Sequence, residues 1–420
     1  MYVWIFQTGE PVHSDLGQPR PMRAMNLANA LIDRGHRVTL WTSAFFHQEK
    51  RHRSRYYETQ KINDLLEIRL IPSRGYKKNI GIDRLIDHAQ LALNLRSALR
   101  QEDSVPDIAV IGYPPIEFAY IAVHWLKKKN VPTILDAKDQ WPQIFVDAFP
   151  EKLQLLAEIV FSPYFYLARK TMRTATAFLS MSQSFLNWMS DFSGRSLTEH
   201  DRIAPLSSTP YEMTAQEKLT SIEYWNRKLV HDDNRPRFFF VGSLTQAFDF
   251  EPVASLAKKS QEQGLGWQFV ICGDGPEKVT IQDHFQGLKN VIFPGWIDRP
   301  KIAALAEMST IGLAPYKGVK NFISNMPNKV TDYLSLGKPI LTSLPGEVGQ
   351  LIEKNSCGLS YAQKDSGQLF SDVKKLIEDQ GLLEIMSINA KETYNQFFSG
   401  EKVYQVLVDH IESLAIDVAE

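Results

Sequence analysis

Residues 269–277 read FVICGDGPE, and this short stretch decides the fold class. An apolar run followed by Gly-Asp-Gly-Pro is typical of a buried parallel strand that turns sharply into a helix. Gly273 and Gly275 allow the backbone of such a turn to approach a ligand, and Pro276 suits the first turn of the helix. An ordinary tight turn is the alternative explanation. Lys278 stands where the dinucleotide motif GxGxxG needs its third glycine, which disfavours a nicotinamide enzyme.

The alternation of short apolar runs with amphipathic segments extends along the chain in both directions. It predicts an α/β protein with parallel sheets. Strands are expected in the second half at residues 238–241, 268–272, 291–293, 310–314, 339–342 and 358–361, and in the first half at residues 2–7, 37–42, 67–71, 107–112, 132–136, 177–181 and 202–206. Six such strands complete a doubly wound sheet. Each half of the chain is therefore predicted to be Rossmann-like.

The length of 420 residues exceeds what one hydrophobic core usually organises. We expect an N-terminal domain over residues 1–210 and a C-terminal domain over residues 237–400. The polar residues 211–236 are expected to link them. A last helix over residues 401–420 is able to pack back on the N-terminal domain.

Charge and cysteine content argue against several classes of function. The 47 Lys and Arg residues against 48 Asp and Glu residues give a formal net charge of -1, so there is no general reason to expect a nucleic-acid partner. Cys272 and Cys357 form no CxxC motif and lie near no His cluster, so neither a disulfide framework nor structural zinc is expected. No apolar stretch of the sequence is long enough to cross a bilayer. We expect a cytoplasmic protein.

A second motif lies in residues 310–334, where an apolar run is followed by a loop and then a helix. Ser324 or Asn325 can cap this helix, and Pro327 fits its first turn. Gly337 can end it. The helix thus follows the carboxyl end of a predicted strand, which is where open α/β sheets bind ligands.

Lys329 and Asp332 lie three residues apart near the start of this helix. Free N–H groups and the helix dipole attract a phosphate there, and Lys329 would add a full positive charge. Asp332 could accept hydrogen bonds from ribose hydroxyls. The alternative is a solvated ion pair with little energetic effect.

Two polar stretches of the first half also follow predicted strands. Gly17 and Arg20 lie in a loop after the first strand, and Arg23 is on the helix that follows, so both arginines could contact a diphosphate. Asp139 and Trp141 follow the fifth strand. A solvated surface loop and a turn or capping acid are the alternatives. The sequence contains neither GxSxG nor HExxH, so it offers no motif for a hydrolase of these classes.

Together these stretches resemble the retaining glycosyltransferases of the GT-B fold, the fourth family of the usual sequence classification. The resemblance is strongest to members that build bacterial surface polysaccharides such as O-antigen and capsule. The matching stretches are residues 17–23, 34–39, 139–142, 240–244, 273–277, 291–295, 327–333 and 337–339. Each stretch alone is weak, whereas their order and spacing together are specific.

The resemblance implies transfer of a hexosyl or N-acetylhexosaminyl group from a nucleotide-diphosphate sugar, with UDP as the preferred nucleotide. It implies that the C-terminal domain binds the donor and that the N-terminal domain binds the acceptor, a glycan or a lipid-linked glycan. The chemistry it implies uses no metal and no other cofactor, and no Asp-x-Asp motif stands at a plausible strand end. The nucleotide diphosphate would leave from the same face that the acceptor hydroxyl attacks.

On this basis the predicted site residues fall into three groups. Donor binding is assigned to Gly17, Arg20, Gly242, Ser243, Gly273, Gly275, Pro276, Ser324, Asn328, Lys329 and Asp332. The acceptor side is assigned to Arg23 and Trp141, and catalysis to Asp139 and Lys329.

Three departures from the family pattern affect these roles. Ser324 and Asp332 stand where the family has two glutamates eight residues apart, and Ser243 stands where many members begin an Arg and Lys pair that binds diphosphate. Lys329, Arg20 or Arg23 must then supply the charge. Asp139 lies where the family usually has a His, and we expect it to orient or deprotonate the acceptor hydroxyl.

Two other functions share this architecture. A nucleotide-sugar epimerase would need acids flanking the sugar for proton transfer. A binding scaffold that has lost turnover would explain Ser324 and the missing basic pair.

Basic and aromatic stretches of the first half predict a peripheral contact with the anionic inner face of the cytoplasmic membrane. The basic runs are residues 50–55, 77–78 and 127–129, and the aromatic stretch is residues 161–166. Solvated helix ends and buried aromatic side chains are the alternative.

Overall fold

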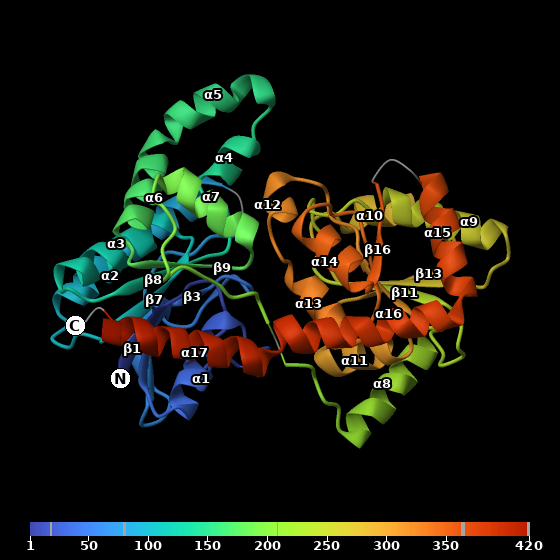
Figure 1. The fold of residues 1–420 in the computed structure, drawn as a ribbon, viewed down its shortest axis with the longest axis horizontal. Coiled ribbons are helices and arrows are strands. Elements are labelled where there is room, and N and C mark those ends of the chain that lie inside the picture. Colours follow the sequence, from blue (N-terminus) through green and yellow to red (C-terminus); the bar gives the residue numbers. More distant parts are fainter. Residues whose placement is uncertain (17–18, 79–80, 208, 363–365, 418–420) are drawn as a thin grey trace. The chain divides into compact units, whose positions relative to one another are not determined.

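The computed structural model describes residues 1–16, 19–78, 81–207, 209–362 and 366–417. The chain forms two compact units, one of Met1–Pro205 together with Glu401–Glu420 and the other of Leu206–Gly400 (Figure 1). Of the helices in the described ranges, none is both long and apolar enough to span a membrane.

Within its described residues, the N-terminal unit contains an eight-stranded sheet of order β10-β9-β8-β7-β1-β2-β6-β5. β5 pairs antiparallel with β6, and the other neighbours are parallel. The strands are β1 (Tyr2–Phe6), β2 (Arg37–Ser43), β5 (Glu58–Lys61), β6 (Leu66–Ile71), β7 (Ile108–Tyr113), β8 (Thr133–Ala137), β9 (Ala177–Ser180) and β10 (Arg202–Ile203). A separate antiparallel ribbon joins β3 (Phe45–Phe46) to β4 (Arg51–His52).

Helices cover both faces of this sheet. The helices of the unit are α1 (Arg23–Asp33), α2 (Ile82–Arg100), α3 (Ile116–Lys128), α4 (Gln143–Asp147), α5 (Glu151–Val160), α6 (Ser162–Thr174), α7 (Gln183–Ser193) and α17 (Gly400–Asp417), and α5 contributes no residue to either core. Alternate residues of β1 point to opposite faces: Trp4 packs with α2, α3, α6 and α7, and Ile5 packs with α1 and α17. Leu407 and Ile411 of α17 are buried in this second core, so the last helix belongs to the N-terminal unit.

The C-terminal unit has a parallel sheet of order β13-β12-β11-β14-β15-β16. Its strands are β11 (Arg237–Val241), β12 (Gln268–Cys272), β13 (Val291–Gly295), β14 (Ile311–Ala314), β15 (Ile340–Thr342) and β16 (Gly358–Ser360). The helices are α8 (Ala215–Arg227), α9 (Glu251–Glu262), α10 (Lys278–His284), α11 (Arg299–Glu307), α12 (Lys320–Ile323), α13 (Asn328–Ser335), α14 (Glu347–Asn355), α15 (Ser366–Glu378) and α16 (Gln380–Thr393), followed by the π-helical turn η1 (Tyr394–Phe398).

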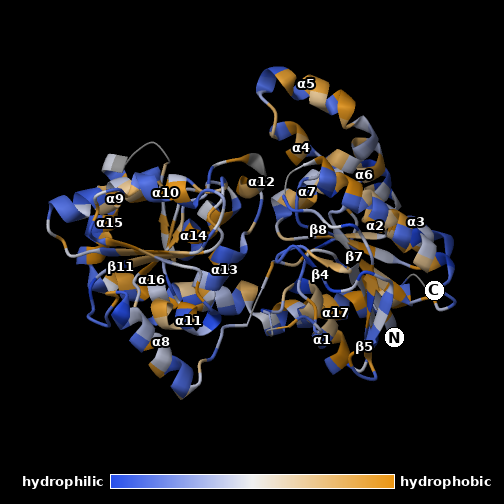
Figure 2. Ribbon diagram, turned by 180° about the vertical axis from the view of Figure 1, so that it is seen from behind, coloured by the Kyte–Doolittle hydropathy of each residue, from blue (hydrophilic) through white to orange (hydrophobic). Residues whose placement is uncertain are grey.

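The central strand β11 explains why this sheet is covered on both faces. Phe238 and Phe240 lie in one core with α9 and α15, and Phe239 lies in the other core with α8, α11, α13 and α14. A strand buried on both sides reads as a continuous apolar run, and Figure 2 shows β11 as hydrophobic. The strand order reverses between β12 and β14, on either side of β11, which places a topological switch point at its carboxyl end.

The α/β class and the two Rossmann-like sheets predicted from the sequence are confirmed. β3, β4 and β5 were not predicted, because β3 and β4 have only two residues each and β5 has only polar residues. The strand expected at residues 202–206 is only the two-residue β10. Residues 211–236, expected as a linker, carry α8, whose buried Trp225 donates its indole N–H to the carbonyl of Lys301 at 2.9 Å. This segment therefore belongs to the C-terminal unit.

Candidate functional site

Two glycine-containing turns meet at the carboxyl ends of β11 and β12. The N–H of Gly242, after β11, donates to the carbonyl of Cys272 at 3.1 Å. Gly273 has a φ of 138°, and a Cβ on it would lie 1.8 Å from the carbonyl oxygen of Gly242. A Cβ on Gly275 would lie 2.2 Å from the carbonyl oxygen of Leu244. These glycines are required because the two turns touch each other, a reason that differs from the close ligand approach expected from the sequence.

The helix of the second motif is α13, and it begins at Asn328. Pro327 occupies the N-cap position with an extended backbone, so the prediction that it lies in the first turn was wrong by one residue. Neither Ser324 nor Asn325 caps the helix; the Asn325 side chain instead accepts from its neighbour's backbone N–H at 2.8 Å. The N–H groups of the first turn of α13 therefore have no capping side chain and can bind an anion.

Lys329 lies in the first turn of α13, and its amine reaches the end of β11. Nζ donates to the carbonyl of Val241 and lies 4.0 Å from the ring centroid of Phe240. A Cβ on Gly242 would lie 2.3 Å from Nζ, so this glycine makes room for the amine. Burial lowers the pKa of Lys329 from 10.5 to about 8, although Asp332 opposes the shift. The amine is charged at neutral pH in apolar surroundings, a state that a bound anion would stabilise.

Tyr333 fixes α13 on the sheet. Its hydroxyl accepts from the N–H of Val241 and donates to the carbonyl of Leu313, both at 3.2 Å. The ring lies so close to β14 that a Cβ on Gly312 would be 2.5 Å away. Tyr333 thus holds the helix across β11 and β14, the strands of the switch point, and thereby positions Lys329. The prediction of site residues from the sequence did not include it.

The remaining predicted donor residues lie around this junction. Pro276 precedes α10, which begins at Lys278, so its predicted place in the first helical turn was also wrong. Lys278 pairs with Asp274 at 3.2 Å. Ser243 and Asn328 are exposed, whereas Ser324 and Asp332 are partly buried.

In the N-terminal unit, Asp139 lines a pocket of about 200 Å³. Lys138 forms part of its wall, and its amine donates to Gln7 Oε1 at 2.9 Å and to Glu10 Oε1 at 2.5 Å. The pocket lies beside the carboxyl ends of β1, β7 and β8, and both polar and apolar side chains line it. Such a pocket can hydrogen-bond the hydroxyl groups of a sugar.

Two histidines that line this pocket, His47 and His88, were not predicted as site residues, because no sequence motif marks them. His47 Nδ1 lies 2.6 Å from the Tyr76 hydroxyl, and the His88 ring centroid lies 5.7 Å from that of Trp141. Burial lowers the pKa of His47 to about 4 and that of His88 to about 3, and the Arg84 guanidinium adds to both shifts. Both imidazoles are therefore neutral at pH 7 and can donate and accept hydrogen bonds. His47 follows β3, whereas His88 lies on α2, so no short sequence motif contains both.

Arg23 and Trp141, predicted on the acceptor side, are core residues. Arg23 is 4% exposed, its Nε pairs with Asp136 at 2.8 Å, and its Nη1 donates to the carbonyl of Ala204 at 2.9 Å. Trp141 is buried and packs edge to face against Phe145 at 4.5 Å. The structure thus corrects the role of Arg23, whose charge is committed to the core and not to an acceptor.

Other predictions on the N-terminal surface have mixed outcomes. Gly17 lies outside the described residues, and Arg20 is partly exposed with a polar partner. In the basic run at residues 50–55, the Arg53 side chain is buried and pairs with Asp15 at 2.7 Å, whereas Arg55 is exposed. Among the residues that the structure describes, no three His, Cys, Asp or Glu side chains are grouped so as to hold a metal ion.

Comparison with known proteins identifies the unit that carries Lys329. Residues 221–393 match the family model described as glycosyl transferases group 1. These residues are similar to group 1 glycosyl transferases, and they include both glycine turns and the whole of α13.

Two curated relatives are glycosyltransferases. The chain is 22% identical to alpha-D-kanosaminyltransferase of Streptomyces kanamyceticus over 161 residues, which are 38% of this chain and 40% of that protein. It is 30% identical to the putative teichuronic acid biosynthesis glycosyltransferase TuaH of Bacillus subtilis over 110 residues, which are 25% of this chain and 26% of that protein. The matches thus span less than half of either relative.

Solved structures of glycosyltransferases share the fold along nearly the whole chain. Sucrose-phosphate synthase from Thermosynechococcus elongatus gives a TM-score of 0.73 at 12% identity and covers 98% of both chains. WaaG, a glycosyltransferase involved in lipopolysaccharide biosynthesis, gives 0.64 at 14% identity and covers 98% of this chain and 99% of that chain. Anabaena HepE in complex with UDP gives 0.62 at 14% identity with the same coverage. The predicted GT-B fold is confirmed.

Proposed function

We propose that the protein is a retaining glycosyltransferase that moves a sugar from a UDP-sugar to a lipid-linked or polysaccharide acceptor in bacterial surface-glycan synthesis, at the inner face of the cytoplasmic membrane. The position of Lys329 carries the proposal: a cation in apolar surroundings lies at the carboxyl ends of β11 and β12, within the residues similar to group 1 glycosyl transferases. HepE binds UDP, which supports UDP as the nucleotide. The roles that WaaG and TuaH have in surface glycans support the class of acceptor.

In the proposed reaction, the bond from the sugar C1 to the nucleotide diphosphate breaks while C1 bonds to the acceptor oxygen on the same face. The acceptor proton passes to the departing phosphate oxygen if Asp139 only orients the hydroxyl, or to the Asp139 carboxylate if Asp139 is the base. Lys329 and the N–H groups at the start of α13 stabilise the negative charge of the leaving diphosphate. Asp332 accepts hydrogen bonds from the ribose. Lys329 supplies the positive charge, so the proposal includes no metal.

The acceptor is proposed to bind in the N-terminal pocket. Asp139 orients or deprotonates the attacking hydroxyl there. The neutral rings of His47 and His88 add hydrogen-bonding groups to the same pocket. Because both rings are neutral at pH 7, they do not place an additional charge beside the acceptor.

Nucleotide binding is the first test. Thermal unfolding with UDP, GDP, ADP, TDP and CDP should show the largest rise in Tm with UDP, because a ligand that binds only the native state stabilises it. No shift with any of the five would contradict the donor site at α13. A larger rise in Tm with another nucleotide would change only the proposed base of the donor and would leave the donor site in place.

Turnover is the second test. NMR of UDP-sugar consumption should show hydrolysis or transfer with the anomeric configuration retained. Asp139→Asn should lower kcat at least about tenfold, while Asp147→Asn on the exposed end of α4 should not. Inverted product would refute the retaining mechanism, an epimerised donor would indicate the epimerase, and nucleotide binding without turnover would indicate a scaffold.

A further inference from the structure

Helix α5 exposes an apolar face. Five of its ten residues are large aliphatic side chains with exposed fractions between 48% and 73%: Leu153, Leu155, Leu156, Ile159 and Val160. Its one buried residue is Ala157. Helices on a protein surface normally turn such residues inward, so α5 has its apolar side toward solvent.

The arrangement around the helix axis makes this a continuous face. At about 100° per residue, the five aliphatic side chains occupy an arc of about 160°. Gln154 and the acids Glu151 and Glu158 lie outside that arc, and Lys152 lies within it. Contiguous apolar surface rimmed by polar residues marks an interaction site.

The next helix along the chain, α6, exposes cations. Arg169, Lys170 and Arg173 line a groove of about 820 Å³ together with the single acid Glu158 and exposed Tyr166. Arg169 Nε donates to the carbonyl of Phe192 at 3.3 Å. Arg173 Nε donates to the carbonyl of Ser193 at 2.5 Å, so both arginines are held against the end of α7.

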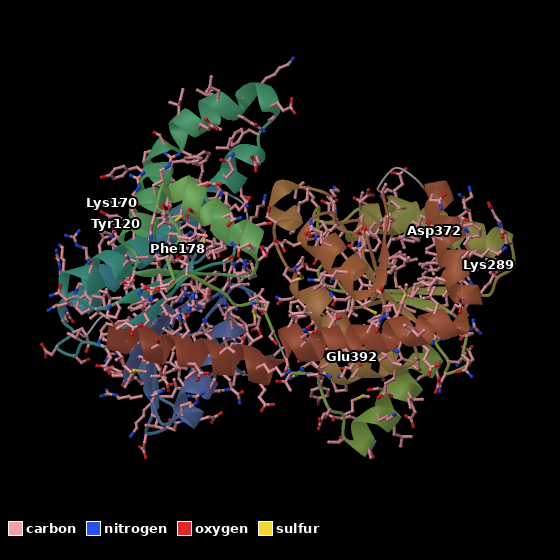
Figure 3. The ribbon with its side chains drawn as sticks, in the orientation of Figure 1. Tyr120, Lys170, Phe178, Lys289, Asp372 and Glu392 are labelled. Atoms are coloured by element: carbon pink, nitrogen blue, oxygen red, sulfur yellow. The ribbon has the colours of Figure 1, made fainter. Side chains whose placement is uncertain are left out.

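Aromatic rings surround the middle cation of this set. The Lys170 amine lies 5.7 Å from the ring centroids of both Tyr120 and Tyr166. Figure 3 shows Lys170 beside Tyr120 at the surface of the N-terminal unit. Amphipathic aromatic side chains beside cations are typical of surfaces that meet lipid headgroups.

We propose that α5 and the outer face of α6 dock on an anionic lipid bilayer. The aliphatic face of α5 enters the boundary between headgroups and acyl chains, and the three α6 cations contact lipid phosphates. This surface differs from the basic runs that the sequence favoured. This proposal rests on the proposed function in one respect: a lipid-linked acceptor would be presented to the enzyme at that bilayer.

A second copy of the chain fits the surface of α5 and α6 less well than an anionic bilayer does. A two-fold dimer through α5 would place the same surface on both subunits. The three cations of one α6 would then approach those of the other, which costs free energy. An anionic bilayer complements both the apolar and the cationic parts of the surface.

Co-sedimentation of the full chain with vesicles tests the proposal. We expect binding to phosphatidylethanolamine vesicles containing phosphatidylglycerol, and weaker binding without it or in high salt. Leu155→Glu with Ile159→Glu should lower binding about tenfold or more, and Arg169→Gln with Lys170→Gln should lower binding to the anionic vesicles about tenfold. The matched control, Ile385→Glu with Ile388→Glu on α16, changes comparably exposed residues and should bind normally.

A fluorescent label locates the contact. Both native cysteines are fully buried, so Leu155→Cys can be labelled selectively with a polarity-sensitive dye. Its emission should shift to the blue when vesicles are added, and the same dye on Leu219→Cys of α8 should not respond. Unchanged emission at position 155, or normal binding by the α5 double variant, overturns the proposal. So does a wild-type dimer that this variant converts to monomer without any vesicle binding.

These results are separable from the test of the proposed function. The UDP-dependent rise in Tm should be retained in the α5 double variant, because Lys329 and α13 lie in the other unit. Vesicle binding without any nucleotide effect would defeat the proposed function alone. A nucleotide effect without vesicle binding would defeat the docking proposal alone.

Discussion

Replacing Lys329 by Met separates the proposed function of this side chain from its effect on stability. Met retains an unbranched apolar stem of similar length but has neither charge nor donor. The variant therefore removes the cation that we assign to the diphosphate while leaving the packing of α13 nearly unchanged. We expect activity and stability to respond very differently.

The effect on stability comes from opposing contributions. Lowering the pKa of Lys329 from 10.5 to about 8 corresponds to a cost of about 3 kcal/mol for holding the charged amine at pH 7, and partial exposure makes this an upper limit. Against it stand the hydrogen bond to Val241, worth about 1.5–3 kcal/mol, and the contact with Phe240, worth about 0.5–1 kcal/mol. The sum is near zero, so the Tm of Lys329→Met should lie within about 4 °C of wild type.

The effect on activity has no such compensation. Loss of one charged group that stabilises a leaving group commonly costs about 10²- to 10³-fold in kcat. We therefore expect Lys329→Met to lower kcat at least about 100-fold and to abolish most of the UDP-dependent rise in Tm. Lys259→Met is the control, because its amine also lies over a ring, 5.7 Å from the Phe370 centroid, but in the last turn of α9. A rate within about threefold of wild type would refute the role of Lys329.

The dependence on pH checks the same reasoning. The folded protein releases the Lys329 proton at a lower pH than the unfolded chain does, so the unfolded chain binds more protons between pH 8 and 10.5. The free energy of unfolding of wild type should therefore rise with pH in this window relative to Lys329→Met. UDP affinity should fall over the same range, because the amine is then neutral before binding. Parallel stability profiles for the two proteins would contradict the lowered pKa.

Three further substitutions test other parts of the structure. Gly273→Ala should lower the free energy of unfolding by at least about 2 kcal/mol in denaturant titration, because its Cβ would meet the Gly242 carbonyl; Gly264→Ala, with a positive φ but open surroundings, should cost about 1 kcal/mol. Asp332→Ala should weaken UDP binding about tenfold in calorimetry through lost ribose hydrogen bonds, and an unchanged Kd would remove it from the site. Arg23→Met should cost about 3–5 kcal/mol because it removes the nearer charged partner of buried Asp136 and leaves only the Lys138 amine, 3.7 Å away, and a parallel loss of UDP binding would contradict its assignment to the core.

Much of the fold is visible in the sequence because parallel strands buried on both faces must be apolar throughout. β11, with three consecutive phenylalanines, is the clearest case. The pattern cannot reveal β5, whose residues Glu58–Lys61 are polar and pair only at the sheet edge. It also cannot show that α8 belongs to the C-terminal unit, since α8 buries only two of its residues there, Ser221 and Trp225.

The donor side of the candidate site was predictable in part because its residues form two short local motifs. The register of the helix starts was not, because a proline fits both the N-cap and the first turn, and this accounts for the one-residue error at Pro327. The N-terminal pocket gathers His47, His88 and Asp139 from three separated segments. Only the folded sheet brings them together, so local sequence carries no signal for that set.

Two buried cations show why charge in a sequence does not reveal function by itself. Arg23 and Lys329 each lie near the start of a helix that follows a predicted strand, and both were assigned to ligands. Arg23 meets the Asp136 carboxylate at 2.8 Å and two backbone carbonyls, so the core itself balances its charge. Burial lowers the pKa of Lys329 although Asp332 lies nearby, so that carboxylate does not offset the cost of burying the amine. We propose that an anion binds beside Lys329, where Gly242 makes room for the amine, and that this difference separates a ligand-binding cation from a structural one.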